Sequence, residues 1–237
     1  MSDRAARVGW VVDAQVDFME PDGRLYVKDL GDPSDPGSAQ IVGTLERAVA
    51  WMREHCDALV FTGDWHGMDD EEIDAQAPDP TKGTYPPHCM GRSEDPAERA
   101  GAEVIEEIRP LDAIVLPVDA DPVTAKGVAE RAVVDGCPVF IRKRRFDVFV
   151  GNSATEAFLD GLQEQLGAAL HFVVVGVARD VCVTQAVDGM LARDYAVTAL
   201  SDATWGLGLE AEDVTLARWA RGGTVTTLSR LLSEASR

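Results

Sequence analysis

Short runs of apolar, β-branched residues recur along the chain and alternate with longer stretches of helical periodicity. Such alternation is typical of βα units packed around a parallel sheet. The runs predict seven strands, at residues 8–12, 58–62, 113–116, 139–141, 172–175, 196–200 and 224–228. Most runs lack polar alternation, which indicates that both faces of the sheet are covered. We therefore expect an α/β fold with three layers, α/β/α, around a central, mostly parallel sheet.

Apolar residues also recur at three- and four-residue spacing, which predicts helices at residues 41–55, 154–166 and 181–192. Residues 29–37 and 67–91 break this pattern with glycine, proline and acidic residues, and we expect them to form long loops. Long loops in compact domains are often functional. Because no linker and no internal repeat divides the sequence, we expect residues 1–237 to form a single domain.

The composition limits the partners that the chain can have. Of 237 residues, 46% are hydrophobic and 27% are charged, as in globular proteins. The net charge of −19 repels phosphate backbones and anionic lipids, so we expect neither nucleic acid nor a membrane as a partner. The first residues do not resemble a signal peptide, and the four cysteines form no Cys-x-x-Cys pair, so we expect a cytoplasmic, reducing location.

Polar residues that can carry chemistry directly follow several of the predicted strands. Asp13 follows the first strand, Asp64 and His66 follow the second, Lys143 follows the fourth, and residues 177–182 follow the fifth. In open parallel sheets, ligands bind in a crevice at the carboxyl ends of the strands. We therefore expect these residues to share one crevice.

Cys182 lies where an apolar run that ends at Val175 turns into a helical pattern, and a helix N-terminus stabilises a thiolate. The ammonium of Lys143 would lower the pKa of this thiol further, and the carboxylate of Asp13 could accept its proton. Together the three side chains indicate nucleophilic catalysis. Taken singly, they also fit a buried structural cysteine and an aspartate that caps a strand, so this alternative stays open.

Asp64 and His66 stand two residues apart, so their side chains point the same way if the segment is extended. His88 follows two prolines and could complete a cluster with them. Two histidines and one carboxylate leave coordination positions open, which is typical of catalytic zinc or non-haem iron rather than of closed structural zinc. The alternative is that Asp64 caps a turn and His88 is an ordinary loop histidine.

Five segments of the chain, taken together, resemble the isochorismatase-like cysteine hydrolases, and within them the nicotinamidase and pyrazinamidase branch. The segments are residues 12–18, 62–66 with 85–89, 143–149, 176–183 and 201–203. They occur in the order of the family, which is more specific than any single motif. The resemblance implies the isochorismatase-like hydrolase fold and a hydrolase that acts on the C–N bonds of linear amides.

The resemblance implies that the enzyme converts nicotinamide to nicotinic acid and ammonia through a thioester on Cys182. In the family pattern Asp13 acts as general base and then general acid, and Lys143 holds the thiolate and orients Asp13. The backbone N–H groups of Ala178 and Cys182 would form the oxyanion hole, beside a cis peptide bond between Val177 and Ala178.

The resemblance also implies one divalent metal ion, zinc or alternatively iron or manganese, bound by Asp64, His66 and His88. The ion would bind the ring nitrogen of a pyridine carboxamide, and Phe18 and Tyr85 would flank the ring. The implied partner is this small amide substrate. The family commonly forms homo-oligomers, which we expect here as well.

The sequence departs from the nicotinamidase pattern in several places. Residues 90–96 replace a short glycine-rich turn, residues 67–85 lack an additional metal-side histidine, residues 117–136 are longer than the family needs, and Arg179 replaces a small polar residue. These departures bear on the substrate more than on the chemistry, because a fold does not fix its substrate.

Three alternatives follow from these departures and from the residue types. A related cysteine hydrolase would act on another small amide, a ureide or an isochorismate-like substrate, and a metal-free member would not need both His66 and His88. A non-catalytic binding protein would not need Asp13, Lys143 and Cys182 together. A dinucleotide-binding protein is excluded, because no Gly-x-Gly-x-x-Gly follows any predicted strand.

Overall fold

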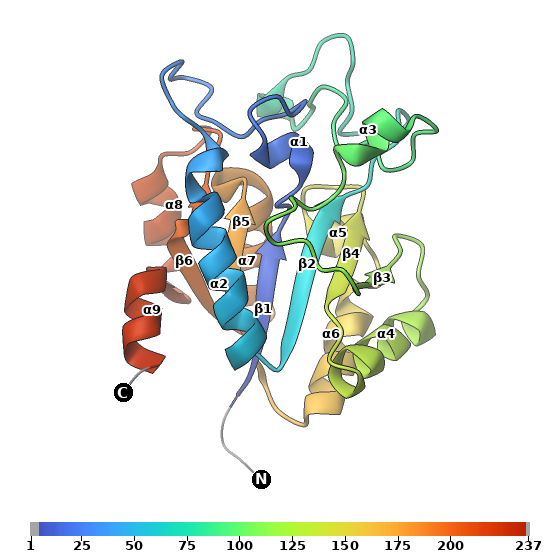
Figure 1. Ribbon diagram of the computed structural model, residues 1–237, viewed down its shortest axis with the longest axis vertical. Helices are drawn as coiled ribbons and strands as arrows, with labels where there is room; N and C mark the ends of the chain where they lie inside the picture. Colours follow the sequence, from blue (N-terminus) through green and yellow to red (C-terminus); the bar gives the residue numbers. More distant parts are fainter. Residues whose placement is uncertain (1–4, 236–237) are drawn as a thin grey trace.

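A seven-stranded parallel sheet forms the centre of the protein in the computed structural model, which describes residues 5–235 (Figure 1). Every strand predicted from the sequence overlaps one of the observed strands. These are β1 (Ala6–Val12), β2 (Ala58–Asp64), β3 (Ile114–Leu116), β4 (Val139–Lys143), β5 (Leu170–Val177), β6 (Ala196–Trp205) and β7 (Thr224–Thr226).

The strands are arranged in the order β3-β4-β2-β1-β5-β6-β7, and every neighbouring pair is parallel. The chain places β2, β3 and β4 on one side of β1 and then returns to the other side of β1 with β5. The boundary between β1 and β5 is therefore the topological switch point, where an open α/β sheet leaves a crevice at the carboxyl ends of its strands.

Helices cover both faces of this sheet, so the predicted three-layer α/β fold is confirmed. One face packs against α2 (Val42–His55) and α9 (Leu228–Ala235), and α2 lies in front of the central strands in Figure 1. The opposite face packs against α4 (Pro122–Val134), α6 (Thr155–Leu166), α7 (Thr184–Leu191) and α8 (Glu212–Trp219).

The side chains of β1 show how one strand feeds two cores. Trp10 and Val12 are buried on the side of α6 and α7, whereas Val11 is buried on the side of α2. Successive side chains of a strand point to opposite faces of the sheet, which gives this alternation. Because both faces are buried, the strand is apolar on both sides, and its sequence is an unbroken apolar run. Short helical segments fill several connections: α1 (Val16–Met19), η1 (Ser38–Ile41), η2 (Pro80–Lys82), α3 (Pro96–Ala100), α5 (Val148–Gly151) and the π-helix η3 (Arg179–Val183).

Several element boundaries differ from the sequence prediction, and two of them change the type of structure. The helix predicted at residues 181–192 begins inside the π-helix η3, and regular α-helix starts only at Thr184. The strand predicted at residues 224–228 ends at Thr226, because α9 begins at Leu228. The carboxylate of Asp202 accepts a hydrogen bond from the Leu228 backbone N–H at 2.8 Å, and this contact draws the chain away from the sheet.

The segment 117–136 contains α4, a helix that the sequence analysis missed. Pro122 occupies its first turn, and the Asp121 carboxylate caps it by accepting a hydrogen bond from the Thr124 N–H at 2.8 Å. Parallel neighbours such as β3 and β4 need a crossover of this kind. The buried face of α4 is built largely from alanine, which weakens the periodic signal in the sequence.

Two further observations concern the cysteines and the length of the helices. All four cysteines are free thiols. None of the helices between residues 5 and 235 is both long enough and apolar enough to cross a membrane.

Candidate active site

The carboxyl ends of β4, β2, β1 and β5 bring three predicted catalytic side chains together. Asp13 follows β1, Lys143 ends β4, and Cys182 lies in η3 directly after β5. Lys143 Nζ lies 2.8 Å from Asp13 Oδ2 and 4.0 Å from Cys182 Sγ. The hydroxyl of Thr62 donates a hydrogen bond to Asp13 Oδ1 at 2.7 Å and fixes the orientation of this carboxylate. All three side chains are buried, so water does not screen their interactions.

Lys143 is an ammonium held between two carboxylates. Burial lowers the pKa of Lys143, but the charges of Asp13 and Asp64 outweigh burial and raise it well above its ordinary value. Burial alone would likewise raise the pKa of Asp64. Lys143 and the nearby histidines outweigh burial and bring this pKa well below its usual range. The pair therefore stays charged, with Asp64 as the anion that is least ready to accept a proton.

Asp13 and Cys182 behave differently, because burial dominates both. Burial raises the pKa of Asp13 even though Lys143 opposes the shift. Burial also raises the pKa of the Cys182 thiol well above its ordinary value, and Asp13 adds to the rise while Lys143 counteracts it. The expectation of a lowered thiol pKa in the resting protein is therefore wrong. Cys182 rests as a thiol, and Asp13 is a carboxylate whose raised pKa suits it to accept that proton.

The three predicted metal ligands also lie together. Asp64 Oδ2 lies 3.7 Å from His66 Nε2 and 3.8 Å from His88 Nε2, and all three residues are buried. Donor atoms about 2.1 Å from a tetrahedral metal ion stand roughly 3.4 Å apart, so this spacing is close to that of a coordination sphere. The residues present therefore fit a divalent ion such as zinc.

The hydrogen bonds of the two imidazoles direct their free nitrogens at one point. His66 Nδ1 contacts Asp70 Oδ2 at 3.2 Å, and His88 Nδ1 contacts the Pro86 carbonyl oxygen at 2.7 Å. With Nδ1 as the donor in both rings, both Nε2 lone pairs face Asp64. His66 Nε2 is buried and has no hydrogen-bond partner within residues 5–235, which is the condition of a ligand atom without its ion.

The electrostatic field at this cluster favours a cation. Burial lowers the pKa of His66, but the neighbouring carboxylates of Asp64 and Asp70 raise it to about 9. The anionic groups that stabilise a proton on this imidazole would equally stabilise a divalent ion beside it.

Glu72 is a buried carboxylate at this site that sequence reasoning missed. Its Oε2 lies 4.0 Å from His66 Nε2, and both of its oxygens accept the backbone N–H of Phe146 at 2.9 Å. Burial and the charge of Asp64 raise the pKa of Glu72 to about 7. The segment that lacks an additional histidine thus supplies a carboxylate beside His66, and its position in an acidic loop gave no signal in the sequence.

Gln15 and Asp17 hold the metal residues in place, and both were named in the sequence only as part of a motif. Gln15 Nε2 donates to the Asp64 carbonyl at 2.9 Å, and Gln15 Oε1 accepts the Asp64 N–H at 2.8 Å. A second hydrogen bond runs from Gln15 Nε2 to the Ala102 carbonyl at 2.7 Å. Asp17 Oδ2 accepts the Cys89 N–H at 2.6 Å and so anchors the segment that carries His88.

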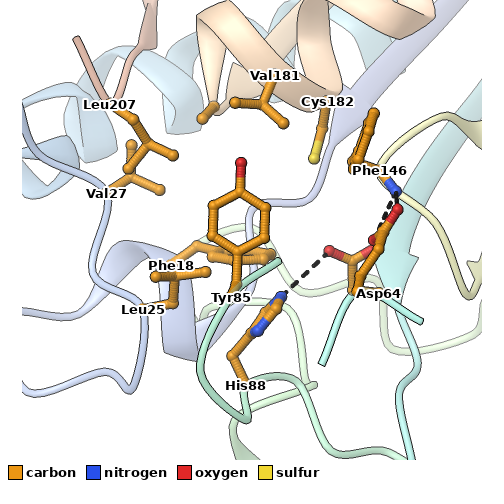
Figure 2. A pocket seen from close by; sticks show the side chains of 12 residues that line it. Phe18, Leu25, Val27, Asp64, Tyr85, His88, Phe146, Val181, Cys182 and Leu207 are labelled. Carbon is orange, nitrogen blue, oxygen red and sulfur yellow. Dashed lines mark hydrogen bonds and ion pairs between the residues drawn. The ribbon is translucent and has the colours of Figure 1, made fainter. Parts of the chain in front are cut away.

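A small cavity joins the two groups of residues, as Figure 2 shows. Cys182 lies at one side of the cavity and the Asp64–His88 pair at another, and the Tyr85 hydroxyl points away from His88, toward the side of Val181. The ring of Phe18 packs against His88 with centroids 5.2 Å apart. Apolar side chains form much of the remaining wall, and the lining comprises Phe18, Leu25, Val27, Asp64, Glu72, Tyr85, His88, Phe146, Ala178, Val181, Cys182 and Leu207.

The loop that carries the nucleophile contains the expected cis peptide bond between Val177 and Ala178. The Ala178 carbonyl accepts hydrogen bonds from the N–H groups of Val181 and Val183, both at 3.1 Å, which closes the loop around Cys182. Ala178 and Cys182 both line the cavity, the position that an oxyanion hole requires.

Arg179 does not enter the cavity lining that surrounds Cys182. Its guanidinium donates to the Thr204 carbonyl at 2.8 Å and the Thr204 hydroxyl at 3.0 Å, and it pairs with Glu212 at 2.9 Å. Arg179 thus ties the nucleophile loop to β6 and α8 as a structural support.

Comparisons with known proteins agree with this geometry. Residues 117–230 match the isochorismatase domain family. No curated protein matches the sequence. Three solved structures share the fold at low sequence identity, and each superposition covers nearly all of both chains.

An isochorismatase-like hydrolase from Alkaliphilus metalliredigens is 20% identical, with a TM-score of 0.62 over 97% of this chain and 99% of the other. The nicotinamidase/pyrazinamidase PncA from Bacillus subtilis is 18% identical, with a TM-score of 0.64 over 93% and 99%. The N-carbamoylsarcosine amidase from Thermoplasma acidophilum is 22% identical, with a TM-score of 0.61 over 94% and 96%. Residues 117–230, just under half of the chain, thus match the isochorismatase domain, and the chain as a whole has the isochorismatase-like hydrolase fold.

Proposed function

We propose that the protein is a metal-dependent cysteine amidohydrolase that converts nicotinamide to nicotinic acid and ammonia. One observation carries the proposal: the thiol of Cys182 and the Asp64–His88 pair border the same small cavity from different sides (Figure 2). A carboxamide that faces Cys182 can therefore belong to a ring whose far edge lies at the metal cluster. The Bacillus subtilis protein with this fold is a nicotinamidase/pyrazinamidase, which supports the same choice.

The character of the cavity suits a flat, uncharged substrate. Phe18 and Tyr85 stand near His88, where they would flank a ring that reaches the metal residues. The twelve lining residues include Asp64 and Glu72 but no arginine or lysine. An isochorismate-like dianion would bring its carboxylates into a cavity that is lined by the acidic side chains of Asp64 and Glu72.

Acylation follows from the positions of three side chains. Asp13 accepts the thiol proton, and Cys182 Sγ attacks the carbonyl carbon of the carboxamide. The developing oxyanion lies toward the N–H groups of Ala178 and Cys182. The C–N bond breaks, ammonia leaves with the proton that Asp13 returns, and the acyl group remains on Sγ as a thioester. Lys143 keeps its charge throughout and holds Asp13 in place.

Deacylation uses the same residues in reverse. Asp13 takes a proton from a water molecule, whose oxygen attacks the thioester carbonyl. The C–S bond breaks, the nicotinic acid is released, and the Cys182 sulfur recovers its proton from Asp13. One water is consumed for each amide bond, and the enzyme returns to its starting protonation state.

Asp64, His66 and His88 would hold the metal ion, with zinc as our first choice and iron or manganese as alternatives. When bound, the ion supplies a positive charge that orients a ring nitrogen. Phe18 and Tyr85 would position the ring. We also propose a cytoplasmic location, because a reducing compartment keeps Cys182 as a thiol. Assembly into a homo-oligomer is a further part of the proposal.

A second candidate within the same chemistry is a ureide or another small amide. Glu72 favours it, because a carboxylate in the cavity wall offers an acceptor for substrate N–H groups that nicotinamide lacks on its ring. The shared fold of the N-carbamoylsarcosine amidase is compatible with this candidate.

The release of nicotinic acid and ammonia from nicotinamide tests the proposal. We expect equal amounts of both products from the purified protein, loss of activity on chelation, and recovery on addition of zinc. Protein that holds one metal ion per chain but hydrolyses only a ureide would move the assignment to the second candidate. Protein that hydrolyses no amide in either metal state would contradict both.

A further inference from the structure

The two histidines of the metal cluster differ in what holds their second ring nitrogen. His88 Nδ1 is held by a neutral group, the Pro86 carbonyl, whereas His66 Nδ1 is held by the carboxylate of Asp70 at 3.2 Å. A carboxylate on the distal nitrogen fixes the tautomer and raises the basicity of a metal-binding imidazole more than a carbonyl does. The structure thus singles out Asp70 among the acidic residues of the loop.

Asp70 is itself held in a closed set of contacts. Its Oδ2 also accepts the Gly67 N–H at 3.0 Å, and its Oδ1 lies 2.7 Å from Arg92 Nη2. The backbone N–H of Arg92 donates to the His66 carbonyl at 3.0 Å. His66, Asp70 and Arg92 therefore form a ring of contacts in which each residue touches the other two.

Gly67 makes room for this ring. A Cβ atom on Gly67 would lie 2.6 Å from Arg92 Nη2 and 2.8 Å from Asp69 Oδ1, which is closer than such contacts occur. The absence of a side chain lets the guanidinium pass over the backbone and reach Asp70.

Arg92 lies in residues 90–96, the segment whose sequence departs from the pattern expected after His88 and Cys89. It reaches back from the segment of His88 to the segment of His66. A second contact, from the His66 N–H to the Cys89 carbonyl at 2.9 Å, joins the same two segments. Arg92 in this loop therefore connects the segment that carries His88 to the segment that carries His66.

We propose that Asp70, held by Arg92, is a positioning residue for the metal site. It keeps the Nε2 lone pair of His66 directed at Asp64 and strengthens that imidazole as a ligand. The inference rests on the proposed metal-dependent function, and it extends that function from the ligands to the residues that set their affinity. Neither Asp70 nor Arg92 is among the residues that line the cavity.

The chain offers a matched control in the neighbouring residue. Asp69 pairs with the same Arg92 nitrogen at 2.6 Å, but its side chain is 79% exposed and has no contact with His66, whereas the Asp70 side chain is 8% exposed. Asp69→Asn and Asp70→Asn remove the same charge from adjacent positions. Only the second replaces the carboxylate on the imidazole.

The test compares zinc affinity of the full-length protein and its variants, by competition with a chromophoric chelator after removal of bound metal. We expect Asp70→Asn to weaken zinc binding by about 10- to 100-fold, the usual cost of losing such a partner. We expect Asp69→Asn to stay within about threefold of wild type. Arg92→Met should fall between them, because Asp70 remains but loses its anchor.

A nitrogen-15 NMR spectrum of the zinc-loaded protein separates positioning from general stability. In wild type and Asp69→Asn, the proton on His66 Nδ1 should give a resonance shifted downfield by the carboxylate. That shift should be lost in Asp70→Asn, while the His88 resonance stays in place. Thermal unfolding of the metal-free variants checks that each one folds, and Arg92→Met supplies the comparison if Asp70→Asn does not.

Equal zinc affinity in Asp69→Asn and Asp70→Asn would overturn the inference. The same holds for an unchanged His66 resonance in Asp70→Asn. Wild-type protein that binds no zinc would remove both the proposed metal site and this inference. Wild-type protein that binds zinc and hydrolyses nicotinamide while the two variants stay alike would remove the inference alone.

Discussion

The nucleophilic half and the metal half of the site are built in different ways. Asp13, Lys143 and Cys182 each lie at or directly after the end of a strand, and hydrogen bonds between neighbouring strands fix the positions of those ends. In the metal half, Asp64 ends β2 and His66 follows it by two residues. His88 comes from a long loop that reaches the site through side-chain contacts.

The difference indicates which residues maintain the geometry of each half. The nucleophilic half draws its geometry from the sheet, which is the most deeply buried part of the molecule. The metal half depends on a few polar residues outside the sheet, such as Gln15 and Asp17, that fasten backbone segments to one another. Loss of a residue of the metal half should therefore lower the turnover of nicotinamide but leave the Cys182 thiol reactive toward an alkylating reagent.

The largest effect should come from the nucleophile itself. Cys182→Ala should lower nicotinamide turnover by about 10⁴-fold or more, because the other members of a catalytic unit do not compensate for its loss. Its metal content should equal that of wild type, as elemental analysis can show. Cys137→Ala is the matched control, because Cys137 is a free thiol outside the cavity lining. Substantial turnover in Cys182→Ala would contradict the assignment.

His88→Ala should act on the other half. Removing a direct ligand should cost at least about 100-fold in turnover, since loss of an outer partner alone costs 10- to 100-fold. Bound metal should fall well below one ion per chain. His55→Ala, on a helix and stacked on Trp51, controls for the loss of an imidazole. If His88→Ala also abolished alkylation of Cys182 by iodoacetamide, the two halves would not be independent.

The rate of that alkylation should depend steeply on pH in metal-free protein. Burial raises the pKa of the Cys182 thiol above its ordinary value, so the reactive thiolate fraction keeps growing as pH rises. We expect about a tenfold increase in rate per pH unit between pH 7 and 9, followed by mass spectrometry of the Cys182 peptide. A plateau below pH 8 would show a lowered thiol pKa and contradict the electrostatic account.

Gln15→Leu should have the smallest effect on turnover and a clear effect on stability. It leaves the N–H and C=O of Asp64 and the C=O of Ala102 without their partner, which should lower the free energy of unfolding by about 2–4 kcal/mol. Gln40→Leu, at an exposed position, is the control in chemical denaturation. An unfolding free energy equal in both variants would show that Gln15 does not hold the metal segment.

The sheet and the nucleophilic half could be predicted from the sequence because they share one signal. Each strand is an uninterrupted apolar run, and a parallel sheet gathers whatever follows those runs at one edge. Asp13, Asp64, Lys143 and Cys182 were found in this way. The prediction of a lowered pKa for the Cys182 thiol was wrong, because burial outweighs the charge of Lys143. Burial depends on packing, which hydrophobic periodicity does not reveal.

The metal half could be predicted only in part. His66 follows a strand, whereas the sequence presents His88 only as a loop histidine that could complete the cluster, with an ordinary loop histidine as the alternative. The loops that contain Glu72, Asp70 and Arg92 show no periodic pattern of apolar residues, and they hold many other charged residues. Their roles depend on contacts between segments that are distant in the sequence, and one sequence carries no signal for such contacts.

Cys182 and the metal cluster are proposed to act on the same carboxamide. Acid quenching during turnover of nicotinamide, followed by mass spectrometry of the peptides, can trap the intermediate that this requires. We expect a nicotinoyl thioester on Cys182 in the zinc-loaded enzyme and none after chelation. Nicotinic acid formed without acylation of Cys182, or equal acylation with and without metal, would contradict the proposal.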